Sequence, residues 1–186
     1  MQTKYILHGG SAQHANSEND KFFKEILKDT GNAVKVLLVH FAGTSERAEL
    51  NKEIDTAQFE RVKGDKKLTF QIASEKTFYV QIAWADVVYF GGGTTVKLLE
   101  ALQQFEGLKE KFTGKIVAGE SAGANFLSTY CYSKSGGGVI KGLGILPIKF
   151  IPHFESKHKE KLNRISGNLE TLTLTNYQFK VYEIEK

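Results

Sequence analysis

Residues 115–125 of this chain, Lys-Ile-Val-Ala-Gly-Glu-Ser-Ala-Gly-Ala-Asn, contain an apolar run, the pattern Gly-x-Ser-x-Gly, and then small residues. The apolar run is typical of a buried strand, and the small residues are compatible with a helix. A serine on a tight turn between strand and helix presents its hydroxyl as a nucleophile, and the two glycines leave room for neighbouring backbone. The pattern Gly-x-Ser-x-Gly also occurs by chance in ordinary turns. Here a strand-like run precedes it and helix-compatible residues follow it, and this context supports the interpretation of Ser121 as a nucleophile.

Strand-like and helix-like segments alternate on the N-terminal side of this turn. The expected strands are residues 5–8, 34–41, 68–73 and 86–90, and the expected helices are 17–28, 45–62, 75–84 and 94–104. This alternation predicts a three-layer α/β domain with a mostly parallel sheet and with ligands at the carboxyl ends of the strands. On the C-terminal side we expect a strand over 146–151 and a short hairpin formed by 171–175 and 179–185.

The composition indicates a soluble globular protein, because 41% of the 186 residues are hydrophobic and 25% are charged. We expect one domain over residues 1–186. The net charge of +4 comes from scattered lysines, so no nucleic-acid partner is expected. Cys131 is the single cysteine and no His/Cys cluster has metal-ligand spacing, which predicts no disulfide, metal or other cofactor.

The apolar runs are short throughout the chain. The N-terminal run is too short for a signal peptide, and no run approaches the roughly 18 apolar residues of a membrane span. We therefore expect a cytoplasmic protein with no membrane association. The sequence leaves the oligomeric state open.

Three successive glycines, Gly91 to Gly93, follow the expected strand 86–90. Such a turn can direct backbone N–H groups outward at an anion. The nucleotide-binding patterns Gly-x-Gly-x-x-Gly and Gly-Lys-Ser/Thr are absent after it, which argues against a phosphate loop. Two interpretations are left: a turn that only needs small residues, or a donor to an oxyanion beside the serine.

His153 is the histidine best placed to act as a base. It follows the expected strand 146–151 through Pro152, which restricts the approach of the chain, and the spacing from Ser121 leaves room for a helix and one further strand. Both residues could then lie on neighbouring loops at one edge of the sheet. The alternative is a solvated loop histidine. His8 and His40 end the first two expected strands at the same edge and could also line the pocket.

Three segments resemble, in order and spacing, the signatures of the dipeptidase E and cyanophycinase family of serine peptidases. They are Phe-Gly-Gly-Gly-Thr-Thr-Val-Lys-Leu-Leu at 90–99, Gly-Glu-Ser-Ala-Gly-Ala-Asn at 119–125, and Ile-Pro-His-Phe at 151–154. The resemblance extends from about Tyr5 to Arg164. It implies a flavodoxin-like fold similar to that of the class I glutamine amidotransferases. It also implies Ser121 as nucleophile, His153 as base, and an oxyanion hole made by the N–H groups of Gly92 and Ala122.

The chain departs from this family at two places. Relatives carry the acid of the triad shortly after the nucleophile helix, whereas residues 132–138 here read Tyr-Ser-Lys-Ser-Gly-Gly-Gly, with no carboxylate. Glu155 and Glu120 are the possible substitutes. Aspartate-specific relatives carry an arginine in the helix after the histidine, and the matching positions are Lys161 and Arg164. A lysine there keeps the positive charge but loses the bidentate fork.

The sequence therefore predicts a serine peptidase-like hydrolase that acts on small, acidic peptides. The missing acid predicts low activity. The alternative hypothesis is a catalytically impaired homologue that serves as a small-molecule or peptide binding domain.

Overall fold

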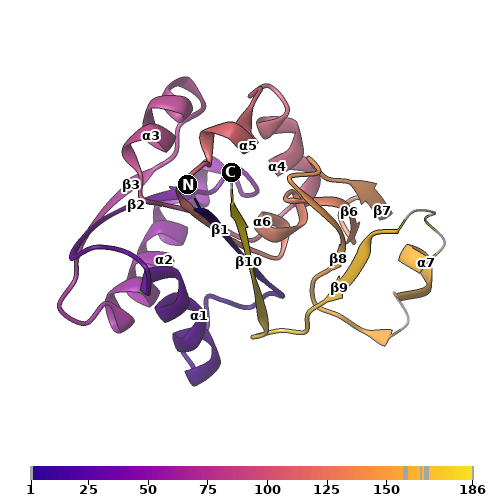
Figure 1. The fold of residues 1–186 in the computed structure, drawn as a ribbon, viewed down its shortest axis with the longest axis horizontal. Helices are drawn as coiled ribbons and strands as arrows, with labels where there is room; N and C mark the ends of the chain where they lie inside the picture. The colour runs from indigo at the N-terminus through magenta and orange to yellow at the C-terminus, as the bar shows by residue number, and fades with distance from the viewer. Residues whose placement is uncertain (1, 157–158, 164, 166–167, 186) are drawn as a thin grey trace.

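The computed structural model describes residues 2–156, 159–163, 165 and 168–185. The main sheet has six strands and the second sheet has four. Figure 1 shows helices on both faces of the main sheet and the second sheet beside it. The architecture is the predicted α/β class, flavodoxin-like and mostly parallel. Within the described ranges, no helix has the length and apolar character needed to cross a membrane.

The main sheet has the strand order β10-β1-β5-β4-β2-β3. Its strands are β1 (Gln2–His8), β2 (Ala33–Val39), β3 (Lys67–Ile72), β4 (Val87–Phe90), β5 (Ile116–Glu120) and β10 (Phe179–Glu185). All neighbours are parallel except β10, which runs antiparallel to β1. The strand that ends at the Gly-x-Ser-x-Gly turn, β5, therefore lies near the middle of the sheet, where both of its faces are buried.

Helices cover the two faces of this sheet, and the side chains of β2 show how. Val36 and Leu38 pack with α1 (Ser17–Leu27) and α2 (Ala48–Val62), whereas Leu37 and Val39 belong to the opposite core. Successive residues of a strand point to opposite faces, so a nearly continuous apolar strand fills both cores. The opposite core also takes in α3 (Phe78–Trp84), α4 (Thr95–Leu102), α5 (Leu108–Lys111) and α6 (Ala122–Asn125).

Two predicted helices begin with a separate 3₁₀ turn. These turns are η1 (Ser45–Arg47) before α2 and η2 (Glu75–Thr77) before α3. Neither Arg47 nor Thr77, the residue preceding each α-helix, makes a side-chain capping hydrogen bond. A tightened 3₁₀ turn is a common way to begin a helix, and here it takes the place of a capping side chain.

The second sheet has the order β7-β6-β8-β9 and contributes side chains to the same core as α4 and α6. It consists of β6 (Ser128–Ser133), β7 (Gly138–Lys141), β8 (Leu146–Ile151) and β9 (Glu170–Thr173), with α7 (Lys159–Asn163) between β8 and β9.

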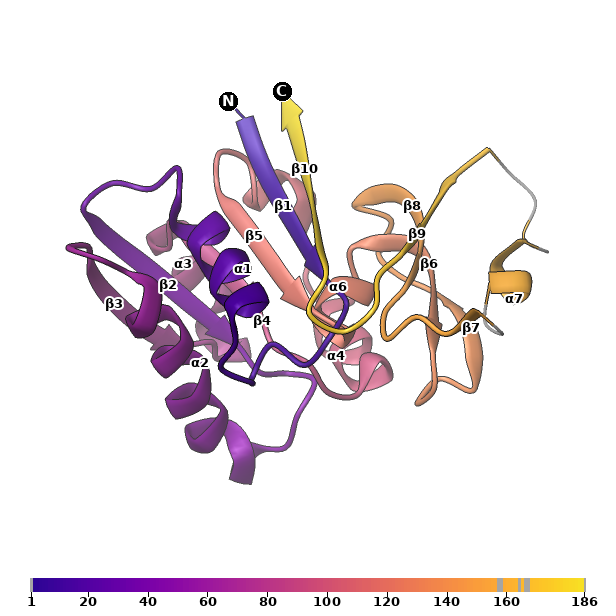
Figure 2. The ribbon, with the colours of Figure 1, turned by 90° about the horizontal axis from the view of Figure 1, so that it is seen from below.

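The C-terminal strands occupy the predicted segments, and the last one is antiparallel. Its hydrogen-bonded partner, however, is β1 rather than β9, which lies parallel to β8 in the second sheet. Figure 2 shows β10 alongside β1 and β9 alongside β8. Pairing with β10 along all seven residues of β1 covers what would otherwise be an open sheet edge. Residues 174–178 consequently connect the two sheets.

Candidate active site

Ser121 lies in the turn between β5 and α6. Its backbone has φ 50° and ψ −104°, a conformation that residues with a side chain rarely adopt. The Ser121 N–H donates to the carbonyl of His8, 3.0 Å away, which ties the turn to β1. A Cβ atom at Gly119 would lie 2.0 Å from the Gly123 carbonyl oxygen, and one at Gly123 would lie 2.1 Å from that of Phe90. Both glycines are therefore required by close backbone contacts, as the sequence predicted.

His153 lies just after β8 and also has a positive φ, 47°. Its N–H donates to the carbonyl of Gly9 at 2.8 Å, and its ring rests against Gly10, where a Cβ atom would come within 2.0 Å of Cε1. Ser121 Oγ lies 2.9 Å from His153 Nε2. The structure thus brings the predicted nucleophile and the predicted base into hydrogen-bond contact.

Asn176, in the segment that connects the two sheets, provides the partner of the second ring nitrogen. Its Oδ1 lies 2.6 Å from His153 Nδ1. An amide oxygen can only accept, so the proton sits on Nδ1, and Nε2 accepts the hydroxyl proton of Ser121. The sequence reasoning missed Asn176 because it looked for a carboxylate before His153. The signal that the sequence offered was Asn176 itself, a polar residue in the segment between the two C-terminal strands.

Glu120 is buried and serves a different part of the site. Its Oε1 accepts the N–H of Ala12 at 2.9 Å, in the loop after β1. Burial raises the pKa of this carboxyl group, and hydrogen bonds from the N–H groups of Ala12, Ser11 and Gly92 oppose that rise. A Cβ atom at Gly92 would lie 3.3 Å from the Glu120 carboxylate. Glu120 therefore joins the β1 loop to the glycine turn, whereas Asn176 holds the position beside His153.

The remaining predicted site residues are placed as follows. Ala122 is the first residue of α6, so its N–H has no partner within the helix. Gly92 lines the same cavity as Ser121. Glu155 lines another cavity together with His153 and Asn176. Arg164 and the side chain of Lys161 lie outside the described residues.

Two cavities reach Ser121 and His153. The larger, about 480 Å³, is lined by all three glycines of the turn and by Arg47, Gln13 and Asn51. The smaller, about 230 Å³, is lined by Gly93, by Asn125 and by Lys134. Both cavities are open at the surface, so a short chain could pass the serine with one residue in each. Among the described residues, no group of three or more His, Cys, Asp or Glu side chains is arranged to hold a metal ion.

The two histidines at the ends of the first strands differ. His40 lines the larger cavity and shares a hydrogen bond with Asp55, 2.8 Å from Nε2 to Oδ2. Burial raises the pKa of Asp55, and the contact with His40 opposes this. His8 is fully buried, and its Nε2 lies 3.1 Å from Asn19 Oδ1.

The second nitrogen of His8, Nδ1, accepts the N–H of Gly10 at 3.1 Å. This bond assigns the proton to Nε2, which donates to Asn19. Burial lowers the pKa of His8 to about 4, so the ring is neutral and supports the loop against which His153 packs.

A family model described as Peptidase family S51 matches residues 5–185. The fold is similar to that of a peptidase from an acI-B1 Actinobacterium, with TM-score 0.73 and 22% identity over 98% of this chain and 84% of that one. It is also similar to a putative peptidase E protein from Listeria monocytogenes EGD-e, with TM-score 0.67 and 16% identity over 100% of both chains. No curated protein matches. At these identities the two structures show a shared fold.

Proposed function

The chain belongs to peptidase family S51, and on that premise we propose that it is a serine-type peptidase acting on small, acidic peptides. The observation that carries the proposal is the row of contacts from Ser121 Oγ to His153 Nε2 and from His153 Nδ1 to Asn176 Oδ1. A hydroxyl, an imidazole and an oriented acceptor are the three parts that nucleophilic acyl transfer requires. The positive φ of Ser121 supports the interpretation of its turn as a nucleophile elbow.

In the proposed reaction, Ser121 Oγ attacks the scissile carbonyl while His153 Nε2 takes its proton. The carbon–nitrogen bond then breaks, and His153 returns the proton to the leaving amine. Water repeats the sequence on the acyl-enzyme and releases the acid. Throughout, the Asn176 amide oxygen holds the proton on Nδ1 and keeps the ring facing the serine.

The oxyanion hole is proposed to consist of the N–H groups of Ala122 and Gly92. Ala122 follows the nucleophile directly and its N–H has no helical partner. The N–H of Gly92 also contributes to the hydrogen bonding of Glu120. An oxyanion would therefore share this donor with a buried carboxylate, which predicts weaker stabilisation than two free donors give.

The second candidate function is a binding domain with little or no hydrolysis. One observation favours it: the third member of the relay, Asn176, is neutral. A carboxylate stabilises the imidazolium that forms during the reaction, whereas an amide oxygen supplies orientation with only a dipole. Some cysteine peptidases use an asparagine in this position, so orientation alone supports catalysis when the nucleophile is readily ionised. A serine is not, and low turnover is expected.

Labelling with a fluorophosphonate probe tests the proposal. We expect stoichiometric modification of the wild-type protein, none in Ser121→Ala, and strongly slowed modification in His153→Gln. Parallel assays with aspartyl dipeptides should show hydrolysis that depends on the same two residues. Absence of both labelling and hydrolysis from pH 6 to 9 would support the binding domain instead.

A further inference from the structure

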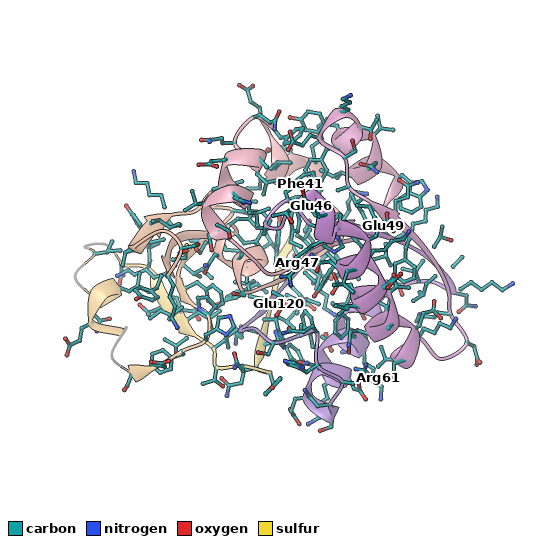
Figure 3. All side chains as sticks on the ribbon, turned by 180° about the vertical axis from the view of Figure 1, so that it is seen from behind. Phe41, Glu46, Arg47, Glu49, Arg61 and Glu120 are labelled. Carbon is teal, nitrogen blue, oxygen red and sulfur yellow. The ribbon has the colours of Figure 1, made fainter. Side chains whose placement is uncertain are left out.

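The larger cavity beside Ser121 carries one described basic side chain with a permanent charge. Of the described lysine and arginine residues, only Arg47 lines it. Arg47 ends η1 and precedes α2, so the guanidinium approaches the cavity from the α2 side, while Ser121 and His153 approach from the ends of β5 and β8. Figure 3 shows Arg47 and Glu120 near the middle of the molecule.

The guanidinium of Arg47 has no anionic partner among the described residues, which leaves its donors available to a ligand. Arg61, on α2, differs because its Nε donates to Asp20 Oδ1 at 2.7 Å. Figure 3 places Arg61 at the far end of α2 from Arg47, and Arg61 does not line the cavity. An arginine presents five donors in a planar fork that matches a carboxylate. Arg47 therefore meets the geometric requirement for carboxylate binding, and Arg61 provides a control of the same residue type.

The two acids that line the same cavity are already occupied. Asp55 is held by His40, and Glu120 is held by backbone N–H groups. Neither forms an ion pair with Arg47 within 4.0 Å. Both are buried, whereas Arg47 is exposed. An entering carboxylate would meet the guanidinium at the mouth, along with the amide side chains of Gln13 and Asn51.

We propose that Arg47 binds the side-chain carboxylate of the substrate residue that supplies the scissile carbonyl. This inference rests on the proposed function and names the residue that recognises the acidic side chain of the substrate. The larger cavity is assigned to the acyl side because Gly91, Gly92 and Gly93 all line it, whereas Gly93 alone lines the smaller one. The position differs from Lys161 and Arg164, to which the family resemblance points.

The decisive measurement compares two dipeptides that differ in one charge, Asp-Leu and Asn-Leu. In Arg47→Gln, the ratio of kcat/KM for Asp-Leu over Asn-Leu should fall about 10- to 100-fold, because one charge-assisted interaction is lost. The value for Asn-Leu itself should change little. Arg61→Gln and Lys134→Gln, which remove a cation outside this cavity and one from the smaller cavity, should keep the wild-type ratio. An unchanged ratio in Arg47→Gln, or a loss of the ratio in Lys161→Gln instead, overturns the assignment.

Binding without turnover separates this inference from the proposed function. Calorimetry with Asp-Leu in Ser121→Ala should show affinity that falls about 10- to 100-fold on adding Arg47→Gln and is unaffected by Arg61→Gln. If wild-type protein hydrolyses neither dipeptide while this Arg47-dependent binding is seen, the peptidase proposal fails and the assignment of Arg47 stands. If Ser121→Ala does not bind Asp-Leu, or binds it equally with and without Arg47, the assignment is wrong.

Discussion

The two halves of the candidate site are built in different ways. Ser121 follows β5, a central strand of the main sheet, and the close backbone contacts of its turn are made with β1, β4 and the helix after it. His153 and Asn176 come from the second sheet and from the link between the sheets, and their placement depends on contacts with the loop after β1. The proposed nucleophile is therefore positioned by local structure, and the proposed base by the packing of two sheets.

This difference predicts where the site tolerates change. The serine turn is held by backbone contacts that side-chain substitutions elsewhere do not reach. The placement of His153 and Asn176 depends on a few interactions with the loop after β1. Among them are the hydrogen bonds from His153 N–H to the Gly9 carbonyl and from Tyr177 N–H to the Gly10 carbonyl. We therefore expect substitutions near His153 to change activity to different extents, whereas loss of Ser121 should abolish it.

The largest effect is expected for Ser121→Ala. Removing a serine nucleophile costs on the order of 10⁶-fold in turnover in enzymes of this mechanism. The half-buried hydroxyl contributes little to packing, so the melting temperature should stay close to that of the wild type. Ser74→Ala, at an exposed residue that lines neither cavity, is the control and should keep activity. Turnover retained in Ser121→Ala would contradict the assignment of the nucleophile.

Gly10→Ala tests the base side directly. The added Cβ atom would lie 2.0 Å from His153 Cε1, and φ of +130° disfavours any side chain at this position. The ring must move, and a displacement of about 1 Å can cost about 100-fold in rate. Gly31→Ala, where no atom lies within 4 Å of the new Cβ, is the matched control. We expect kcat to fall about 100-fold in Gly10→Ala only, measured by steady-state kinetics beside thermal melts.

Asn176 is the residue at which the base side can be improved. Asn176→Asp places a carboxylate beside Nδ1, which stabilises the imidazolium, and should raise kcat about 10-fold or more. It should also move the acid limb of the pH–rate profile to higher pH, because a neighbouring negative charge raises the pKa of an imidazole. Asn176→Leu should lower kcat by about 10-fold or more through loss of orientation. If Asn176→Leu were faster than the wild type, Asn176 would not be needed to orient His153 for the reaction.

Glu155→Gln is the companion to the Asn176 variants. Glu155 lies two residues after His153, while the observed partner of Nδ1 is Asn176. Kinetics of Glu155→Gln should therefore match the wild type within about 3-fold, by the usual scale of surface substitutions. A collapse of turnover in this variant would identify Glu155 as a functional acid.

The sequence predicted the turn at Ser121 and the nearness of His153 to it, but not the contact of Asn176 with His153, for physical reasons. The Ser121 turn and the strand before it are encoded by consecutive residues, so a pattern reveals them. His153 was found because a strand and a proline precede it. Asn176 was missed because its contact with His153 arises only when β9 joins one sheet and β10 joins the other. No local pattern reports that exchange, since two nearby C-terminal strands most often pair with each other.

The last prediction concerns stability rather than rate and involves His8, which supports the loop against which His153 packs. Burial lowers its pKa to about 4, while an exposed histidine in the unfolded chain has a pKa near 6.5. Below about pH 6.5 the unfolded state therefore binds more protons than the folded state. The stabilisation is complete above that pH and is lost as the pH falls toward 4, by at most about 3 kcal/mol.

His8→Gln removes this titration, so the free energy of unfolding of the variant should fall less steeply between pH 6.5 and 4 than that of the wild type. Glu120 and Asp55 have raised pKa values and act in the opposite direction, but they are present in both proteins and drop out of the difference. Urea unfolding at several pH values measures it. Parallel curves for the two proteins over this range would mean that His8 titrates at the same pH in the folded and the unfolded protein, and that the loop behind His153 is held in some other way.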